Sequence, residues 1–223
     1  MTIYRPPSSV RTRVSGSNLP RVVRKHGERA FDRMNTREAL IRCGIECLTE
    51  QGFRTTSIEE VLNRVGVPKG SFYHFFKSKD DFGTAVIDSY VEYYTKKMGS
   101  IFHNESESPI KRLRTFIEVS KEGMIRFQFR RGCLVGNMGQ ELANVSDRFR
   151  TQLEAVLQSW EDMLMECLQG AIDLGEIHGD NDPRSLSRFF WIGWEGAILR
   201  SKLMRSAEPI DHFADLFFER VAV

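Results

Sequence analysis

The chain has 223 residues, 41% of them hydrophobic, and a formal net charge of +2 at neutral pH. This length is sufficient for one large or two small globular domains. No run approaches the roughly 18 consecutive apolar residues that a membrane span requires, and the first twenty residues lack the apolar segment of a secretory signal. The four cysteines are scattered, with Cys43 and Cys47 on one predicted helix, which favours a reduced, cytoplasmic protein over a disulfide framework.

The charge is distributed unevenly along the chain. Residues 1–34 carry eight Arg or Lys and two acidic residues, residues 35–82 carry seven of each sign, and residues 83–223 carry seventeen basic and twenty-one acidic residues. Because the first segment is rich in Pro, Ser and Arg and shows no periodicity, we predict a basic, flexible arm over residues 1–34. Its charge suggests contact with a polyanion, although a solubilising tail would have the same composition.

Helical periodicity begins at residue 35, where Asn35 or Thr36 is a candidate cap, and a first helix is predicted to end at Gly52. Ser57, followed three residues later by a glutamate, is a capping box for a second helix. "PKGSFYHFF" predicts a short third helix that starts at Pro68.

The remainder of the chain repeats this helical pattern. No stretch shows sustained period-two alternation bounded by hairpin turns, so strands are not expected. We therefore predict an all-α protein of about nine helices, with a DNA-binding domain over residues 35–82 and a second helical domain over residues 83–223. The later helices are predicted to start at Ser78, Ser108, Ser146, Asp182 and Pro209.

Residues 35–82 match the helix-turn-helix pattern, in which a tight turn joins the second and third of three short helices. Gly66 permits that turn. The third helix carries a cation, hydroxyl groups and an imidazole, which suit phosphate contacts and hydrogen bonds to base edges. The candidate DNA contacts are Lys69, Gly70, Ser71, Tyr73 and His74 on this helix and Lys79 at the start of the next, although Tyr73 also has a packing interpretation.

The stretch "TTSIEEVLNRVGVPKGSFYHFFKSKDDF" resembles the DNA-binding signature of the TetR family of one-component transcriptional regulators. The resemblance implies that Thr56 and Ser57, at the start of the second helix, also meet DNA. It implies further that Arg24 and Lys25 of the arm reach flanking phosphates. The arm lacks the compact Arg-Gly-Arg pattern of a minor-groove insertion, so we expect sequence-neutral contacts that weaken steeply with salt.

One helix-turn-helix contacts only a few base pairs, so such proteins bind near-palindromic operators as dimers. The stretches "FFWIGWEGAILRSKLM" and "IDHFADLFFERV" have more aromatic and apolar content than a water-facing surface carries, which favours a homodimer interface there. Burial in the chain's own core is the alternative. The predicted interface residues are Gly193, Gly196, Ala197, Phe213 and Phe217.

Two stretches, "FRRGCLVGNMGQELAN" and "FWIGWEGAILRSKL", are similar to the acrylate-responsive, AcuR-type repressors within the TetR family. This resemblance implies a regulator of acrylate and dimethylsulfoniopropionate breakdown that a small molecule, acrylate or a related compound, releases from its operator. A site for this carboxylate needs hydrogen-bond donors or a cation, and apolar walls for the vinyl group. The candidate walls are Phe116, Met124, Trp160, Trp191 and Trp194, and the candidate donors are Arg131, Asn137 and Gln140.

Cys133 lies in an unusual glycine-rich segment with Gly132, Gly136 and Gly139. We expect these small residues to let a short helix pack closely beside a ligand cavity. A related TetR-family sensor of electrophiles and oxidants has a cysteine in a similar "GCL" setting, which makes Cys133 a candidate sensor thiol. Reversible ligand binding, covalent or redox sensing at Cys133, and inert packing of this thiol are three open interpretations.

A cysteine-dependent enzyme is a remote alternative. Nucleophilic catalysis requires a positioned base, and the histidines lie in separate segments without a catalytic signature. A helical interaction module that does not bind DNA would leave "PKGSFYHFF" unexplained. We therefore expect no enzymatic activity, no cofactor and no metal, and we expect the fourth helix, over residues 79–98, to transmit ligand binding to the DNA-binding domain.

Overall fold

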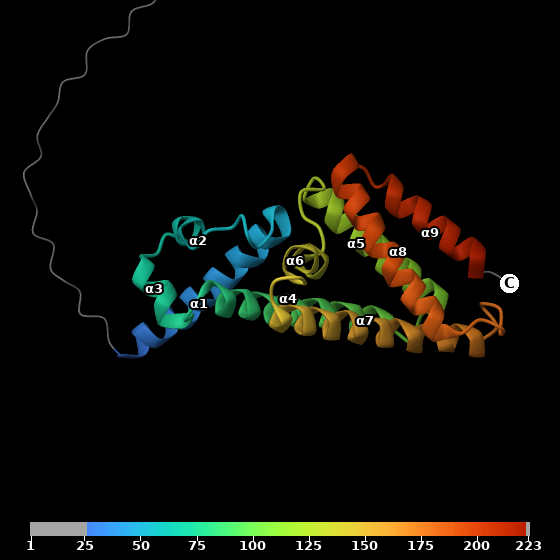
Figure 1. The fold of residues 1–223 in the computed structure, drawn as a ribbon. Helices are drawn as coiled ribbons and strands as arrows, with labels where there is room; N and C mark the ends of the chain where they lie inside the picture. The colour runs from blue at the N-terminus through green and yellow to red at the C-terminus, as the bar shows by residue number, and fades with distance from the viewer. Residues whose placement is uncertain (1–25, 222–223) are drawn as a thin grey trace, which may run out of the picture.

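Nine helices make up the part of the chain that the structure, a computed structural model, describes: the backbone of residues 26–221 and the side chains of residues 35–221 (Figure 1). No strand occurs in this part, so the predicted all-α fold is confirmed. Arg24 and Lys25 of the predicted arm lie outside the described residues. In chain order the helices are α1 (His26–Gln51), α2 (Ile58–Val65), α3 (Lys69–Phe75), α4 (Lys79–Phe102), α5 (Pro109–Arg126), α6 (Leu134–Leu142), α7 (Asp147–Asp173), α8 (Pro183–Met204) and α9 (Glu208–Val221).

Helix α1 starts at His26, well before the predicted start at residue 35. Asn35 and Thr36 therefore lie inside the helix that one of them was predicted to cap. Residues 26–34 contain only three apolar side chains, Ala30, Phe31 and Met34, which are too few to show a helical periodicity. These residues were predicted to belong to the flexible arm, and that part of the prediction is wrong because they are helical.

Four of the other predicted starts are side-chain caps in the structure: Ser57, Ser78, Ser146 and Asp182. Ser108 occupies the N-cap position of α5 without a side-chain hydrogen bond, and Pro209 lies one residue inside α9, so its prediction as a start is wrong by one residue. The Ser57 hydroxyl accepts a hydrogen bond from the backbone N–H of Glu60 at 3.0 Å, and Ser78 accepts one from Asp81 at 3.0 Å. Gly66 ends α2 with a φ of +75°, a left-handed conformation that favours glycine. The helix-turn-helix thus forms from local signals within one short segment.

The helices divide into a small head and a larger body (Figure 1). Helices α1, α2 and α3 form the head, and α4 runs from it into the body alongside α7. Helices α5 and α8 pack against this long pair, α9 packs against α8 and α5, and the short α6 lies between the end of α1 and α7. Among residues 26–221, no helix has both the length and the apolar character that crossing a membrane requires.

Three phenylalanines attach α3 to the rest of the head. Phe72, Phe76 and Phe82 are buried, and their ring centroids lie 5.1 to 5.3 Å apart. Edge-to-face and tilted aromatic contacts of this kind fix orientation as well as burying area. The position of α3 is therefore set by packing against α4.

Candidate DNA-binding face and ligand cavity

Helix α3 buries one face and presents the other to solvent. Phe72 is fully buried, whereas its neighbour Tyr73 is 51% exposed. A β carbon at Gly70 would meet no atom of this chain within 4 Å, so packing does not require glycine there. DNA contact by this helix stays a prediction, and the residues named for it are all exposed or half-buried: Lys69, Gly70, Ser71, Tyr73 and His74.

The prediction that the Thr56 side chain contacts DNA is wrong. Its side chain is 1% exposed, and its hydroxyl donates to the carbonyl of Gly52 at 2.7 Å. The hydroxyl therefore closes the turn between α1 and α2 and is not available to a phosphate. Ser57, one residue later, is exposed, and its hydroxyl caps α2.

Lys79 is half-buried beside that same turn. Its ammonium donates to the carbonyl of Arg54 at 3.2 Å and lies 4.7 Å from the ring centroid of Phe53. Burial lowers the pKa of this lysine. A phosphate contact by Lys79 remains a prediction, and in the structure its charge stabilises the turn.

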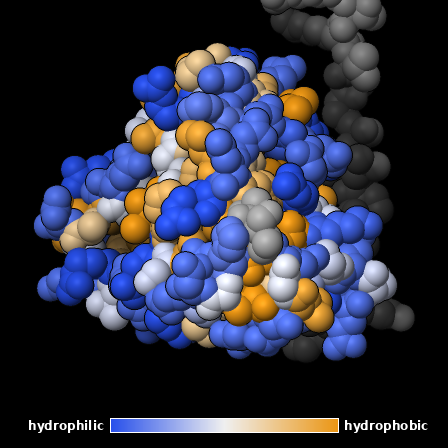
Figure 2. All heavy atoms as spheres, turned by 90° about the vertical axis from the view of Figure 1, so that its right-hand side faces the viewer, coloured by the Kyte–Doolittle hydropathy of each residue, from blue (hydrophilic) through white to orange (hydrophobic). Residues whose placement is uncertain are grey.

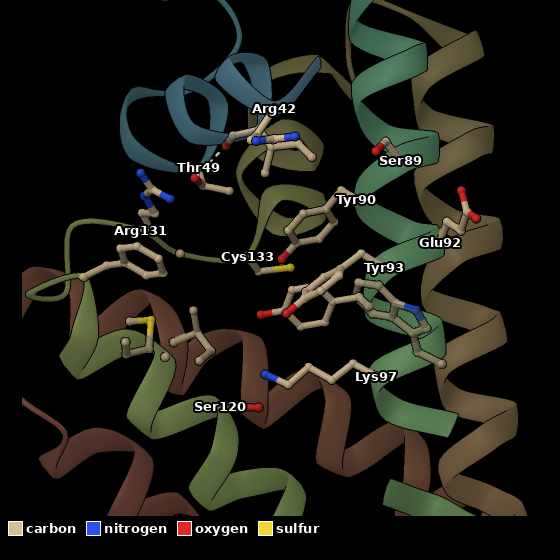
Figure 3. Close-up of a pocket in the computed structure, with 18 of the residues that line it drawn as sticks. Arg42, Thr49, Ser89, Tyr90, Glu92, Tyr93, Lys97, Ser120, Arg131 and Cys133 are labelled. Carbon is tan, nitrogen blue, oxygen red and sulfur yellow. Dashed lines mark hydrogen bonds between the residues drawn. The ribbon is translucent and has the colours of Figure 1, made fainter. Parts of the chain in front are cut away.

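A cavity of about 850 Å³ lies in the body next to the head. It is lined by α1, α4, α5, α7 and α8 and by the segment before α6 (Figure 3). One wall is aromatic. The ring centroids of Trp160 and Trp191 lie 5.3 Å apart, and those of Phe116 and Trp194 lie 5.4 Å apart. A largely apolar hollow with a few polar groups is the usual form of a small-molecule site.

Most of the predicted ligand residues line this cavity. Asn137 and Gln140 are the exceptions, and their prediction as ligand donors is wrong. The Asn137 amide donates to the carbonyls of Leu48 and Thr49 at 3.4 and 3.1 Å, and Gln140 faces a second hollow between α6, α7 and α8. The predicted residues that do line the cavity are Phe116, Met124, Arg131, Cys133, Trp160, Trp191 and Trp194.

Cys133 precedes α6 at its N-cap position and lines the cavity near Tyr90 (Figure 3). Burial raises the pKa of its thiol well above the ordinary value, and the neighbouring Glu195 raises it further. Burial likewise raises the pKa of the Glu195 carboxyl. The thiol is therefore protonated at neutral pH, and thiolate is the nucleophilic form.

The glycines around Cys133 have different roles. A β carbon at Gly136 would overlap the carboxylate of Glu195, so glycine is required for this contact between α6 and α8. At Gly132 a β carbon would lie 3.6 to 3.8 Å from its neighbours, which is ordinary contact. At Gly139 it would meet nothing within 4 Å. Close packing is confirmed for Gly136 and is wrong for Gly139.

Three aromatic side chains with polar groups, Tyr90, Tyr94 and Trp191, line the cavity. Tyr90 and Tyr94 stack with their ring centroids 4.6 Å apart, and burial raises the pKa of Tyr94 to about 12. Both phenols are thus neutral donors. The indole N–H of Trp191 is buried and has no hydrogen-bond partner among the described residues, although buried donors are normally paired.

One cation that lines the cavity was missed in the sequence analysis. Lys97 of α4 and Ser120 of α5 both point into the cavity (Figure 3), and Lys97 forms no ion pair among the described residues. Arg131, the predicted cation, is engaged by Glu50 at 3.0 Å and by Glu46 at 3.7 Å. The spacing of Lys97 from the tyrosines at positions 90 and 94 is helical and could have placed it on the cavity face of α4.

Most of the predicted dimer-interface residues are packed inside the chain. A β carbon at Gly193 would overlap the ring of Phe213, and Phe217 is 1% exposed between α8 and α9. Ala197 is also buried. These residues join α8 to α9, and their prediction as a surface seam is wrong, whereas Gly196 is exposed with open space beside it.

The exposed apolar residues of α8 form a separate stripe. Phe189 is 52% exposed, and Ile192 and Leu203 are each 70% exposed. The stripe follows a spacing of three and four residues, as in a helix-pairing surface. Figure 2 views the molecule from the side on which α9 lies and shows apolar surface interspersed among hydrophilic side chains. The stripe consists of Phe189, Ile192, Gly196, Leu199 and Leu203, with Leu216 of α9 also exposed.

Comparison with protein families assigns both halves of the chain. Residues 40–86 match the model described as "Bacterial regulatory proteins, tetR family", and residues 109–217 match "Tetracyclin repressor-like, C-terminal domain". The transcriptional regulator AcuR of Cereibacter sphaeroides is 44% identical over 198 residues, which cover 89% of this chain and 90% of AcuR. The transcriptional repressor DhaR of a Mycobacterium species is 32% identical over 187 residues, covering 84% and 92% of the two chains.

Solved structures share the fold. The crystal structure of a regulatory protein TetR from Rhodobacter sphaeroides is 43% identical, with a TM-score of 0.82 over 84% of this chain and 99% of that one. The reduced form of Escherichia coli NemR superposes with a TM-score of 0.74 at 24% identity, over 84% and 97% of the two chains. The relatives named here are transcriptional regulators, and none of these names denotes an enzyme.

Proposed function

Because this chain belongs to the TetR family of bacterial transcriptional regulators, we propose that it is a repressor that binds a palindromic operator as a homodimer and is released by a small molecule. The inducer that we propose is acrylate or a related compound. The observation that carries this proposal is the cavity itself, which is lined by α4, the helix that joins the head to the body. A ligand there contacts the element that positions the DNA-binding helices.

The DNA-binding role rests on the exposed face of α3. Lys69 forms no ion pair with another described residue, and it and the polar side chains beside it suit phosphate and base-edge contacts. On the opposite face of α3, Phe72 packs against Phe82 of α4 and so fixes the position of the exposed face. A cytoplasmic protein that controls acrylate and dimethylsulfoniopropionate breakdown would use this face on its operator.

The dimer that we propose forms through the stripe on α8. Its apolar residues at three- and four-residue spacing match what a second copy of the same helix needs for close packing, and Gly196 allows the two backbones to approach. A two-fold pair of heads then meets two half-sites one DNA turn, about 34 Å, apart.

Acrylate fits the chemistry of the cavity. Lys97, with Ser120 and the unpaired N–H of Trp191, offers donors for a carboxylate, and the aromatic wall suits the vinyl group. Acrylate has five non-hydrogen atoms and fills only a small part of about 850 Å³. A larger acrylate derivative, such as a thioester, is therefore included in the proposal.

Covalent sensing at Cys133 is the second candidate mechanism, because this thiol lines the same cavity as Lys97. Its raised pKa works against it, since little thiolate is present at neutral pH. Reversible binding therefore agrees better with the structure. A Cys133→Ser protein that still leaves the operator on addition of acrylate would exclude the covalent mechanism.

The direct test is fluorescence anisotropy of labelled promoter DNA with and without acrylate. We expect sequence-specific binding at nanomolar to micromolar protein, followed by release when acrylate is added. Absence of sequence-specific binding would overturn the regulator role. Binding that acrylate and its thioester leave unchanged would overturn only the proposed inducer.

A further inference from the structure

The corner between α1 and α2 is held by a carboxylate from the body. Glu141 of α6 accepts hydrogen bonds from the backbone N–H groups of Phe53, at 3.0 Å, and Arg54, at 2.8 Å. Gly52 has a φ of +89°, and a β carbon there would overlap the same carboxylate. The corner is therefore shaped to receive Glu141, because two successive N–H groups form a ready anion site.

The end of α1 is held by a cation from a different helix of the body. The Lys202 ammonium of α8 donates to the carbonyls of Thr49 and Glu50 at 3.1 and 3.0 Å. Carbonyls in the last turn lack partners within their own helix, and a cation there opposes the negative end of the helix dipole. Asn137 of α6 and the N–H of Gly132 also donate to the Thr49 carbonyl, at 3.1 and 3.3 Å.

Helix α6 connects this corner to the cavity along one stripe. Cys133 lines the cavity, Asn137 bonds the end of α1, and Glu141 bonds the corner. These residues follow one another at intervals of four, so they lie on one face of the helix. A displacement of the Cys133 end therefore moves the Glu141 end with it, because a short helix moves as a rigid element.

Helix α8 repeats this arrangement. Trp194 and Ile198 line the cavity, and Lys202 follows at the same interval of four residues. The segment that leads into α6 contacts α8 at Gly132, where a β carbon would lie 3.6 Å from Lys202 Cδ and 3.8 Å from Ile198 Cγ2. Two elements thus reach from the ligand site to the same corner of the head.

We propose that Glu141 and Lys202 form a clamp on the α1–α2 corner, and that this clamp couples inducer binding to operator release. A ligand in the cavity shifts α6 and α8, the corner follows, and α2 and α3 turn away from the position that fits DNA. This inference rests on the proposed ligand-released repressor. It adds a second route to the one through α4, and it makes Glu141 and Lys202 positioning residues that touch neither ligand nor DNA.

The test uses Lys202→Met and Glu141→Gln in the full chain. The matched controls are Lys96→Met and Glu166→Gln, which change exposed residues outside the cavity. Operator affinity is measured by fluorescence anisotropy with and without acrylate, and thermal melting checks that each variant is folded. Couplings between sites typically change affinity about 5- to 150-fold.

Inducer occupancy can be followed separately by intrinsic fluorescence, because all three tryptophans of the chain line the cavity: Trp160, Trp191 and Trp194. We expect the clamp variants to bind acrylate as the wild type does. Their operator affinity without acrylate should fall by about fivefold or more, and acrylate should lower it little further. The ratio of the two affinities should therefore shrink in the clamp variants and stay unchanged in the controls.

The clamp would be overturned if both variants fold and the ratio of their operator affinities without and with acrylate equals that of the wild type. If acrylate changes neither the fluorescence nor the operator affinity of the wild type, the proposed inducer fails. The clamp is then judged by operator affinity without ligand, which both variants must still lower relative to their controls. Unchanged ligand-free affinity would overturn the clamp in that case as well.

Discussion

The DNA-binding face and the ligand cavity differ in how the chain encodes them. Half of the candidate DNA contacts lie on one short helix, α3, which is flanked by the local signals of Gly66, Pro68 and Ser78. The cavity is lined from five helices and the segment before α6, so its members are far apart in the sequence. A site made by neighbours in the chain is visible as a motif, whereas a site made by packing is visible only after the helices are placed.

The largest expected effect separates packing from contact within α3. Phe72→Ala should destabilise the protein by about 3–5 kcal/mol, the usual cost of removing a buried phenylalanine, because Phe72 is fully buried. Tyr73→Ala, one residue later, should cost at most about 1 kcal/mol of stability, as exposed sites usually do, and should weaken operator binding. Chemical denaturation and anisotropy measure the two quantities. Equal destabilisation by both changes would mean that Tyr73 is a packing residue.

The second comparison tests which cation of the cavity binds the carboxylate of the ligand. Lys97→Met should weaken acrylate binding by about 10- to 150-fold, since a hydrogen bond to a charged group contributes about 1.5–3 kcal/mol. Operator binding without acrylate should be unaffected. Tryptophan fluorescence titration measures the ligand affinity. The comparison is Arg131→Met, which should leave it nearly unchanged because Glu50 already pairs with Arg131; a larger loss in Arg131→Met would reverse the assignment.

A third comparison uses two glycines of α6. Gly136→Ala should destabilise the protein by about 1–3 kcal/mol, the usual range for overpacking, because the new methyl group meets the Glu195 carboxylate. Gly139→Ala enters open space and should stabilise by about 0.5–1 kcal/mol, the helical preference for alanine. Thermal and urea unfolding give both values. Changes of the same sign would contradict the different roles assigned to these glycines.

The smallest expected effect concerns Cys133. Because burial raises the pKa of this thiol well above its usual value, the folded protein holds less thiolate than the unfolded chain at any pH between the two pKa values. Alkylation of Cys133 by iodoacetamide should therefore be slower in the folded protein than in urea at pH 8, and should accelerate only at strongly alkaline pH. Mass spectrometry of the labelled peptide measures this. Faster labelling of the folded protein would restore the sensor-thiol interpretation.

The sequence-based predictions were most accurate where the signal is local. The capping serines at positions 57 and 78 and the left-handed Gly66 were identified from residue type and spacing, and the all-α fold followed from periodicity. The start of α1 was missed because residues 26–34 contain too few apolar side chains to show a helical periodicity. Most of the residues that were predicted to bind a ligand do line the cavity, but they make up the smaller part of its lining.

The wrong site predictions share one cause: the type of a residue does not specify which other residue its side chain contacts in the fold. Asn137 was taken as a ligand donor, but its amide bonds the end of α1. Phe217 was placed on a surface between subunits, but it is buried under α8. Lys97 and Glu195 were overlooked because charged residues in helices usually face water. In each case the deciding contact comes from a helix that is distant in the chain.

The sequence by itself determined the all-α class, most helix caps, the helix-turn-helix and the family to which the chain belongs, because short-range hydrogen bonding and hydrophobic periodicity depend on neighbouring residues. Only the tertiary structure decided which side chains share the cavity, which face of α8 is exposed, and that Glu141 and Lys202 meet at one corner. These outcomes depend on how whole helices pack, and packing pairs residues without regard to their distance along the chain.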